Sequence, residues 1–282
     1  MPAFEVGTAV GSRTPLLEAR EKVCGRTIYI SDLKLPGMLV GKVLRSPLAH
    51  GRIVSIDASR AWRVPGVKAV VTGSDCPPVR WGGMVPDQYI LPVDGRVRFV
   101  GDEVAAVAAT SEDAAREALA LIDVEYEELP VLLDPQEALS SPVEIHARTE
   151  DGASPNLAFR HRVVLGDPEA GFRESEMVIE RTYRTSYQNA GYLEPVACVA
   201  EPDGRGRLTV WCPTHDPFAK KATIARALGL EPHQVRVRQA AIGGSFGGKI
   251  HHKSYFLAGL LALRAGRPVK LLDSREEALS VT

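Results

Sequence analysis

A glycine-rich loop late in the chain constrains the fold more than any other segment. Four glycines fall within six residues, Gly243-Gly-Ser-Phe-Gly-Gly248, and Lys249 follows them. A short β-type run at residues 235–238 precedes the loop, and a largely apolar run at residues 249–264 follows it. Glycine permits positive φ angles and a close approach of the backbone to a ligand. We therefore expect a strand, a backbone-lined loop and a helix, in that order.

Two other interpretations of this loop stay open. Gly243-x-x-x-x-Gly248-Lys249 matches most of a nucleotide-binding P-loop, but the next residue, Ile250, lacks the hydroxyl that such loops place on Mg²⁺. The large Phe246 also fits poorly inside a loop that wraps phosphates. A plain strand-to-helix connector is the second alternative, although one glycine usually suffices for such a turn.

Composition indicates a globular protein of ordinary surface charge. The 282 residues are 45% hydrophobic and 24% charged, enough for about two domains of roughly 100–200 residues each. With 34 basic and 35 acidic residues, the chain lacks the excess of positive charge typical of nucleic-acid binding. It also lacks an apolar run of about 18 residues and a secretory leader pattern. We expect a cytoplasmic protein with no nucleic-acid or membrane partner.

The pattern of apolar residues predicts a mixed α/β (α+β) fold. In the first half we expect one helix at residues 111–122 and strands at 38–45, 52–56, 67–71, 104–108 and 123–127. In the second half we expect one further helix at 217–228 and strands at 177–185, 195–200, 208–211 and 269–272. The predicted division is a first domain at 1–140, a linker at 141–165 and a second domain at 166–282.

The cysteines and histidines give weak signals for a metal site. The four cysteines, at positions 24, 76, 198 and 212, form no CxxC pair, so we expect no zinc or iron–sulfur site and no metal held by protein ligands. His251 and His252 are neighbours in the expected helix. Adjacent helical residues do not face the same side, so these two are not expected to share a site.

Motifs along almost the whole chain resemble the molybdenum cofactor-binding subunit of the xanthine dehydrogenase/aldehyde oxidase family. The first group is similar to the family's α/β-hammerhead domain: Leu44-Arg-Ser-Pro-Leu-Ala-His50, Gly101-Asp-Glu-Val-Ala-Ala-Val107 and Tyr126-Glu-Glu-Leu-Pro130. The second group resembles the start of its molybdopterin-binding domain: Leu193-Glu-Pro195, Trp211-Cys-Pro-Thr-His215 and the glycine loop. The order and spacing of the motifs carry the assignment.

The resemblance implies a molybdenum–molybdopterin cofactor, held through its dithiolene and present as either a mononucleotide or a dinucleotide. It implies cofactor-binding roles for Gly244, Phe246 and Gly247, with an ordinary core aromatic as the alternative for Phe246. His215 stands where the family often has a glutamine that hydrogen-bonds the cofactor. Ile250 stands at a substrate-binding position where purine hydroxylases have glutamate. Purines are therefore disfavoured against aldehydes, other heteroaromatics, acyl thioesters or carbon monoxide.

The resemblance also implies an activity that needs other polypeptides. The family oxidises carbon substrates with water-derived oxygen and passes electrons to [2Fe–2S] and FAD centres. Its members continue beyond residue 282 and carry the general base there, so we expect no catalytic residue in this chain. A C-terminal molybdopterin-binding subunit, an iron–sulfur subunit, an FAD subunit and a small-molecule substrate are the expected partners. We also expect an exposed apolar face on the second domain. A non-catalytic binding or assembly module of the same fold is the alternative.

Overall fold

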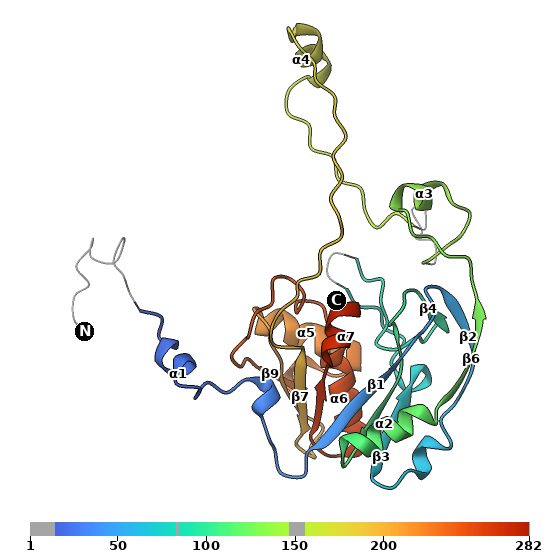
Figure 1. Ribbon diagram of the computed structural model, residues 1–282, viewed down its shortest axis with the longest axis vertical. Helices are drawn as coiled ribbons and strands as arrows, with labels where there is room; N and C mark the ends of the chain where they lie inside the picture. The colour runs from blue at the N-terminus through green and yellow to red at the C-terminus, as the bar shows by residue number, and fades with distance from the viewer. Residues whose placement is uncertain (1–14, 83–84, 147–155, 282) are drawn as a thin grey trace.

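One mixed sheet organises the molecule, and the prediction of an α/β fold is confirmed (Figure 1). The computed structural model describes residues 15–82, 85–146 and 156–281. The large sheet has seven strands in the spatial order β3 (Val67–Thr72), β5 (Glu103–Ala109), β1 (Leu39–Arg45), β10 (Val269–Leu272), β7 (Ala197–Pro202), β8 (Leu208–Trp211) and β9 (Val235–Arg238). A smaller sheet contains β4 (Arg96–Val97), β2 (Gly51–Asp57) and β6 (Asp123–Glu128).

The helices are α1 (Ala19–Val23), α2 (Glu112–Ala120), α3 (Pro135–Ser140), α4 (Pro168–Glu174), α5 (Pro217–Leu228), α6 (Ser254–Ala265) and α7 (Arg275–Ser280). Of these, α2 packs on one face of the large sheet, and α5 and α6 pack on the other. Short 3₁₀ turns lie at Ile30–Asp32, Ala61–Arg63, Gly73–Asp75 and Pro232–Gln234. Successive side chains of a strand point to opposite faces. Accordingly, Ala106 and Ala108 of β5 join the core that contains α6, whereas Val107 and Ala109 join the core that contains α2.

Two adjacent strands join the two halves of the chain in one sheet. β1 pairs antiparallel with β5, from its own half, and parallel with β10, from the end of the chain. β10 in turn pairs antiparallel with β7. The predicted domain limits, 1–140, 141–165 and 166–282, stay a prediction. The hydrogen bonds between β1 and β10 nevertheless make the sheet continuous across them.

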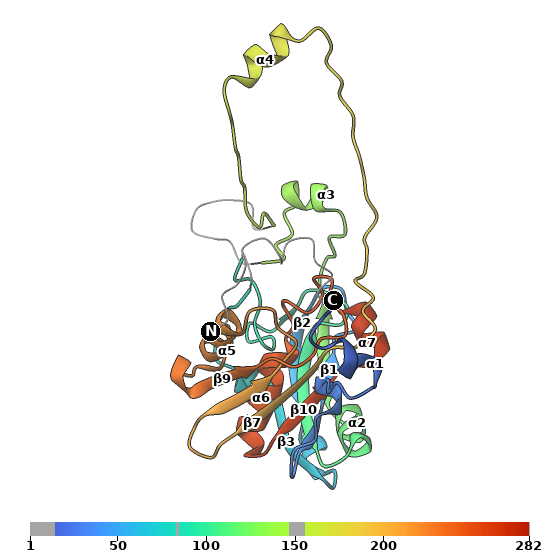
Figure 2. The same cartoon turned by 90° about the vertical axis from the view of Figure 1, so that its left-hand side faces the viewer.

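Residues 157–189 form an excursion that leaves the sheet and carries α4, and residues 190–196 lead back through the core to β7 (Figures 1 and 2). The strand expected at residues 177–185 is wrong, because this stretch is extended but pairs with no strand among the described residues. Apolar side chains on it are open to solvent: Met177 is 77% exposed and Tyr183 is 87% exposed. The expected exposed apolar surface therefore lies on this excursion.

The helix expected at residues 249–264 begins later than predicted. The glycine loop continues as turns, in which Gly248 N–H donates to Ser245 O at 2.9 Å, and α6 starts only at Ser254. Every α6 residue from Ser254 to Ala262 is buried, so this helix crosses the core with no solvent face over that length. Consequently His251 and His252 precede the helix and do not belong to it.

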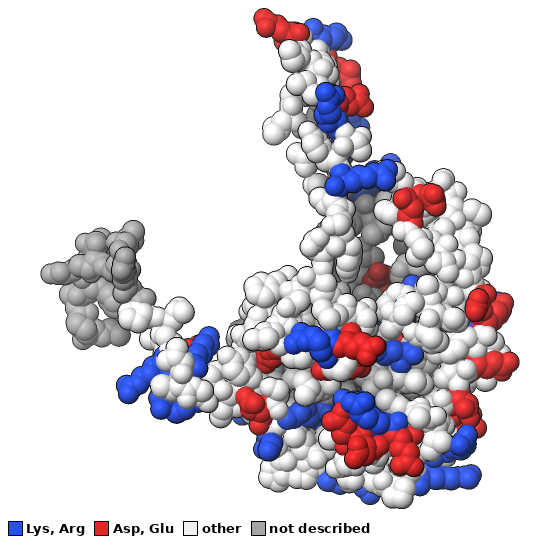
Figure 3. Space-filling view, viewed as in Figure 1, with Lys and Arg blue, Asp and Glu red and all other residues white. Residues whose placement is uncertain are grey.

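The outer surface mixes charges of both signs. On the face shown in Figure 3, lysine and arginine side chains lie among aspartate and glutamate side chains. Among the described residues, the helices are all too short or too polar to cross a membrane.

A buried group of charged side chains lies where β1, β5, α6 and α7 meet. Arg45, at the end of β1, donates from Nε to Glu277 Oε1 at 3.0 Å and from Nη1 to Glu103 Oε1 at 3.1 Å. Lys253, next to α6, donates from Nζ to Asp102 Oδ1 at 2.6 Å and lies 2.9 Å from Glu103 Oε2. We call these five residues the junction cluster.

Asp273 and His252 extend the junction cluster toward β10. Asp273 follows β10 and lies 3.9 Å from Arg45, measured from Oδ1 to Nη2. Its Oδ2 lies 3.0 Å from His252 Nε2. Both side chains are buried, so the pair fixes the chain just before α6 against the end of the sheet. The last turn before α6 is thereby tied to both halves of the chain.

Removing Lys253 should cost far more stability than removing an exposed lysine or arginine. We expect Lys253→Met to lower the free energy of unfolding by about 3–5 kcal/mol, because it leaves the buried carboxylate of Asp102 without its cation and that of Glu103 with Arg45 alone. Arg116→Met is the control, since the Arg116–Glu112 pair is exposed and contributes about 0–1 kcal/mol. Urea denaturation followed by circular dichroism measures both, and equal losses would contradict the assignment.

Acid should weaken the junction cluster in a defined range of pH. Burial alone raises the pKa of Glu103, but the charges of Lys253 and Arg45 outweigh it and hold the pKa at about 2, below its ordinary 4.5. A lowered pKa means that the stabilisation is complete above about pH 4.5 and is lost as the pH falls toward 2.

We therefore expect the Glu103→Gln variant to lose less unfolding free energy than the wild type over this range. Denaturation curves at several pH values measure it. Identical pH profiles for the two proteins would exclude Glu103 as a source of the acid sensitivity.

Candidate cofactor and substrate site

The glycine loop between β9 and α6 has an unusual backbone at its tip. Gly244 and Gly247 have φ angles of 91° and 95°, where glycine is the favoured residue. Between them, Phe246 has a φ of 48°, and in the described ranges it is the one residue other than glycine with a positive φ. This conformation costs a bulky residue about 1–2 kcal/mol. Strain of this kind persists where the surrounding structure enforces it, and it clusters at functional sites.

The Phe246 side chain projects from the loop instead of filling the core. It is 80% exposed, so the alternative of an ordinary core aromatic is wrong. Beside it, Ser245 is buried, and its hydroxyl has no hydrogen-bond partner within the described structure. A Cβ atom placed on Gly247 would meet open space. The tip thus offers an aromatic face, a buried hydroxyl and bare backbone to a group outside this chain, which fits a loop that lies against a cofactor.

Glu194 and Lys249 anchor both ends of the loop. Glu194 Oε2 accepts hydrogen bonds from Gly243 N at 2.7 Å and from Lys249 Nζ at 2.8 Å. Lys249 also lies over the Tyr192 ring, 4.8 Å from its centroid. Burial lowers the pKa of Lys249, and the hydrogen bond to Glu194 opposes that effect. Because its side chain is fully buried and paired, the Lys249 ammonium is not placed to receive a phosphate, which argues against the P-loop interpretation.

His215 and Ile250 line the same cavity, of about 320 Å³. His215 lies just before α5, where Asp216 caps the helix by accepting from Ala219 N at 2.9 Å. Ile250 follows the glycine loop and is 44% exposed. The structure therefore brings together the residues predicted at the cofactor and at the substrate, from segments far apart in sequence. Gly244, Phe246 and Gly247 stand on the neighbouring loop and are not among the residues that line this cavity.

Sequence reasoning missed several residues of this region. His251 lines the cavity with His215 and Ile250, while His252 turns away toward Asp273, so the two histidines indeed serve different places. Lys220 and Trp81 complete the cavity wall, and neither is marked by a motif. Glu194 was visible within a motif, but its contact with the loop was not.

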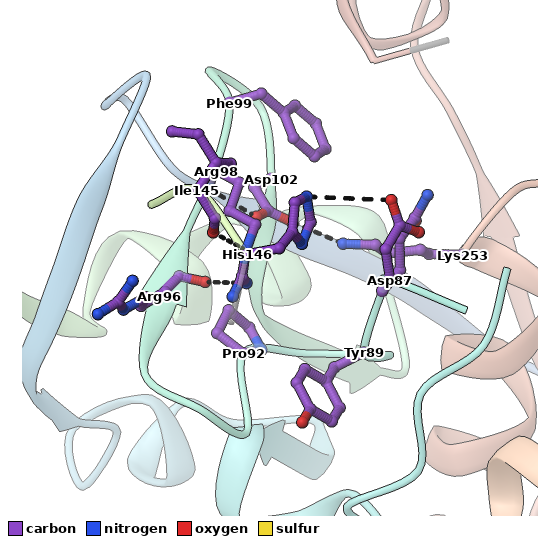
Figure 4. A pocket seen from close by; sticks show the side chains of 11 residues that line it. Asp87, Tyr89, Pro92, Arg96, Arg98, Phe99, Asp102, Ile145, His146 and Lys253 are labelled. Carbon is purple, nitrogen blue, oxygen red and sulfur yellow. Dashed lines mark hydrogen bonds and ion pairs between the residues drawn. The ribbon is translucent and has the colours of Figure 1, made fainter. Parts of the chain in front are cut away.

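A second cavity, of about 200 Å³, lies beside the junction cluster (Figure 4). Its charged side chains already have partners: Lys253 is held by Asp102, and Arg98 donates from Nε to Ile145 O at 3.0 Å. His146 lies 3.9 Å from Asp87. Since its cations are engaged in structural contacts, we do not assign the functional site to this cavity.

Three of the four free cysteines, Cys76, Cys198 and Cys212, are buried and are not placed to act as nucleophiles. Burial raises the pKa of both Cys76 and Cys212 to about 12. Thiols with such pKa values stay protonated near neutral pH, whereas the thiolate is the reactive form. Over the described residues, no group of three or more histidine, cysteine, aspartate or glutamate side chains is arranged to hold a metal ion.

Comparisons with known families cover most of the chain. Residues 24–130 match the family model described as the aldehyde oxidase and xanthine dehydrogenase a/b hammerhead domain. Residues 149–282, which include the glycine loop and the cavity residues from His215 onward, match the molybdopterin cofactor-binding domain. The two matches follow each other in the order that the motifs predicted.

Similar proteins carry the same two domains within longer chains. A probable xanthine dehydrogenase subunit of Bacillus subtilis is 42% identical over 93% of this chain and 34% of its own length. The nicotinate dehydrogenase large molybdopterin subunit of Eubacterium barkeri is 36% identical over 97% of this chain and 63% of its own length. The aldehyde oxidoreductase structure from Desulfovibrio gigas superposes with a TM-score of 0.85 at 30% identity, covering 95% of this chain and 31% of that one.

The fold and the domain matches define a protein with a hammerhead domain and a molybdopterin cofactor-binding domain, and the resemblance drawn from the motifs is confirmed. This chain belongs to the xanthine dehydrogenase/aldehyde oxidase family, and it spans about a third of the Bacillus relative and under two thirds of the Eubacterium relative. The site residues predicted from the motifs, Gly244, Phe246, Gly247, His215 and Ile250, stay predictions for this chain.

Relief of the strain at Phe246 should be measurable without any cofactor. We expect the free energy of unfolding of Phe246→Gly to exceed that of Phe246→Ala by about 1 kcal/mol, because glycine accepts the positive φ and alanine does not. Phe218, which is 83% exposed in the first turn of α5, provides the control. There the order should reverse, because alanine favours a helix over glycine. Equal stability of Phe246→Gly and Phe246→Ala would show that the position is unstrained.

Proposed function

We propose that this chain is the N-terminal part of the molybdenum subunit of a hydroxylase or dehydrogenase, with its glycine loop against the molybdopterin cofactor. One observation carries the proposal: Phe246 is held at a strained positive φ with its ring open to solvent, inside the segment that matches a molybdopterin cofactor-binding domain. A folded protein gains nothing from this arrangement by itself. A group covering the ring would account for both the strain and the exposure.

The residues of the loop would have separate tasks. The Phe246 ring and the Gly247 backbone would lie against the cofactor and exclude water from it, while Gly244 would let the chain approach closely. His215 would donate a hydrogen bond to an oxygen of the cofactor, as a neutral imidazole can. The cofactor, when bound, would supply the redox chemistry that oxidises a carbon substrate with water-derived oxygen.

Ile250 supports a restricted set of substrates. Its side chain cannot hydrogen-bond a purine, so we favour an aldehyde, a heteroaromatic or a related carbon compound. Xanthine appears in the name of the Bacillus relative and nicotinate in that of the Eubacterium relative. Ile250 is our reason to set purines aside for this chain.

Other polypeptides would complete the enzyme. A C-terminal molybdopterin-binding polypeptide would supply the general base, because the chain covers only part of its relatives' length. Subunits carrying [2Fe–2S] clusters and FAD would take up the electrons. The alternative is a non-catalytic assembly module of the same fold. His215 and Ile250 support this alternative, because they stand in place of the residues that the family often uses.

The Phe246→Ala substitution distinguishes the proposed enzyme subunit from the alternative of an assembly module. We expect a complex copurified with the products of neighbouring genes to contain molybdenum and pterin, and Phe246→Ala to lower its turnover by about 10–100-fold through misplacement of the cofactor. Trp62→Ala, at an exposed aromatic outside the molybdopterin cofactor-binding match, should leave turnover unchanged.

Metal analysis, pterin fluorescence and steady-state rates provide the readouts. An active complex without molybdenum or pterin would reject the proposal. Unchanged turnover of Phe246→Ala would favour the assembly module.

A further inference from the structure

The cavity that contains His215 and Ile250 has a lysine on its wall that forms no ion pair within the described structure. At about 320 Å³, it is within the size range of small-molecule sites. Lys220 is the ammonium on its wall, accompanied by two histidines, His215 and His251. Asp216 also lines the cavity, but its Oδ1 is occupied at the start of α5, where it accepts from Phe218 N at 3.1 Å and from Ala219 N at 2.9 Å.

Lys220 differs from the other buried lysines of this chain. Lys249 is paired with Glu194 at 2.8 Å, and Lys253 is paired with both Asp102 and Glu103. Lys220 is equally buried, at 9% exposure, but within the described residues no carboxylate lies within ion-pair distance of it. A buried ammonium without a counter-charge is costly, and such groups are normally paired.

The contacts that Lys220 does make are neutral. Its Nζ donates to Ile250 O at 2.5 Å and lies 5.1 Å from the centroid of the Tyr255 ring. An ammonium has three donor hydrogens, so one carbonyl oxygen leaves capacity for further acceptors. Burial lowers the pKa of Lys220, and the charge of Asp216 opposes this effect without cancelling it.

Trp81 adds an independent sign of a missing acceptor. It lines the same cavity and is 1% exposed. Its indole Nε1–H has no hydrogen-bond partner within the described structure. An indole nitrogen can only donate, and a buried donor is nearly always paired in a native protein. The cavity wall therefore holds an ammonium with one neutral acceptor and an indole N–H with none among the described residues.

We infer that this cavity binds the carboxylate of an anionic organic substrate, with Lys220 as its ion-pair partner and Trp81 Nε1–H as a second donor. A carboxylate offers two acceptor oxygens, which suits two separate donors. Ile250 and the histidine rings would contact the carbon skeleton. This inference rests on the proposed function and narrows its substrate class from carbon compounds in general to carboxylates.

The test compares a carboxylate with its neutral isostere. Benzoate and benzamide are titrated calorimetrically into the native complex that contains this chain. We expect benzoate to bind at least about tenfold more tightly than benzamide. Lys220→Met should weaken benzoate by about 10–100-fold, as expected for loss of a hydrogen bond to a charged group, and should leave benzamide unchanged. Trp81→Phe should weaken benzoate by a smaller factor.

Controls separate recognition from misfolding. Lys221→Met changes the neighbouring lysine, which does not line the cavity, and should retain the benzoate affinity. Benzamide binding by Lys220→Met shows that its cavity is intact, and Lys220→Arg should restore part of the benzoate affinity. Equal affinities of the wild type for both probes, or full benzoate affinity in Lys220→Met, would overturn the inference.

The same preparation keeps the two proposals distinguishable. Pterin and molybdenum are measured on the protein used for titration. A complex that contains both but shows no preference for benzoate overturns the carboxylate site alone. A complex that prefers benzoate but lacks pterin overturns the proposed function and leaves the anion site standing.

Discussion

Buried ion pairs on both sides of the glycine loop determine where the loop and the cavity lie. Lys249 at the end of the loop is held by Glu194, and Lys253, one helical turn further on, is held by Asp102 and Glu103. The first pair ties the loop to the segment before β7, and the second ties the start of α6 to β5 of the other half. Breaking either ion pair would leave a charged group unpaired in a poorly solvated interior, so the loop cannot shift without a large energetic cost. Phe246 can therefore be kept in a conformation that an unanchored loop would abandon.

Much of the fold could be predicted because local signals and tertiary packing agree. The helix predicted at residues 217–228 is α5, since Asp216 and Pro217 start it and Gly229 ends it with a left-handed φ of 67°. The strand predicted at 269–272 is β10. The stretch 177–185 has strand-forming residues but no partner in the described sheet, so its pattern could not show that it would stay unpaired.

Part of the candidate site could likewise be predicted from the sequence, and part could not. The glycine loop is contiguous, and the sequence alone pointed to Gly244, Phe246 and Gly247. Lys220 and Trp81 line one cavity only because the fold places distant segments together, and no local pattern encodes that proximity. The late start of α6 has a similar origin, since the preference of the apolar run for helix gives way to the anchored turns of the loop.

The excursion at 157–189 has a consequence for the solubility of the protein. Residues 177–185 are extended and pair with no strand among the described residues, and they carry exposed side chains such as Met177 and Ile179. A bare, apolar strand edge is a template for pairing with any other extended chain. Left uncovered, this segment would allow copies of the protein to associate with one another. A surface that covers it therefore matters as much for solubility as the quality of the folded core.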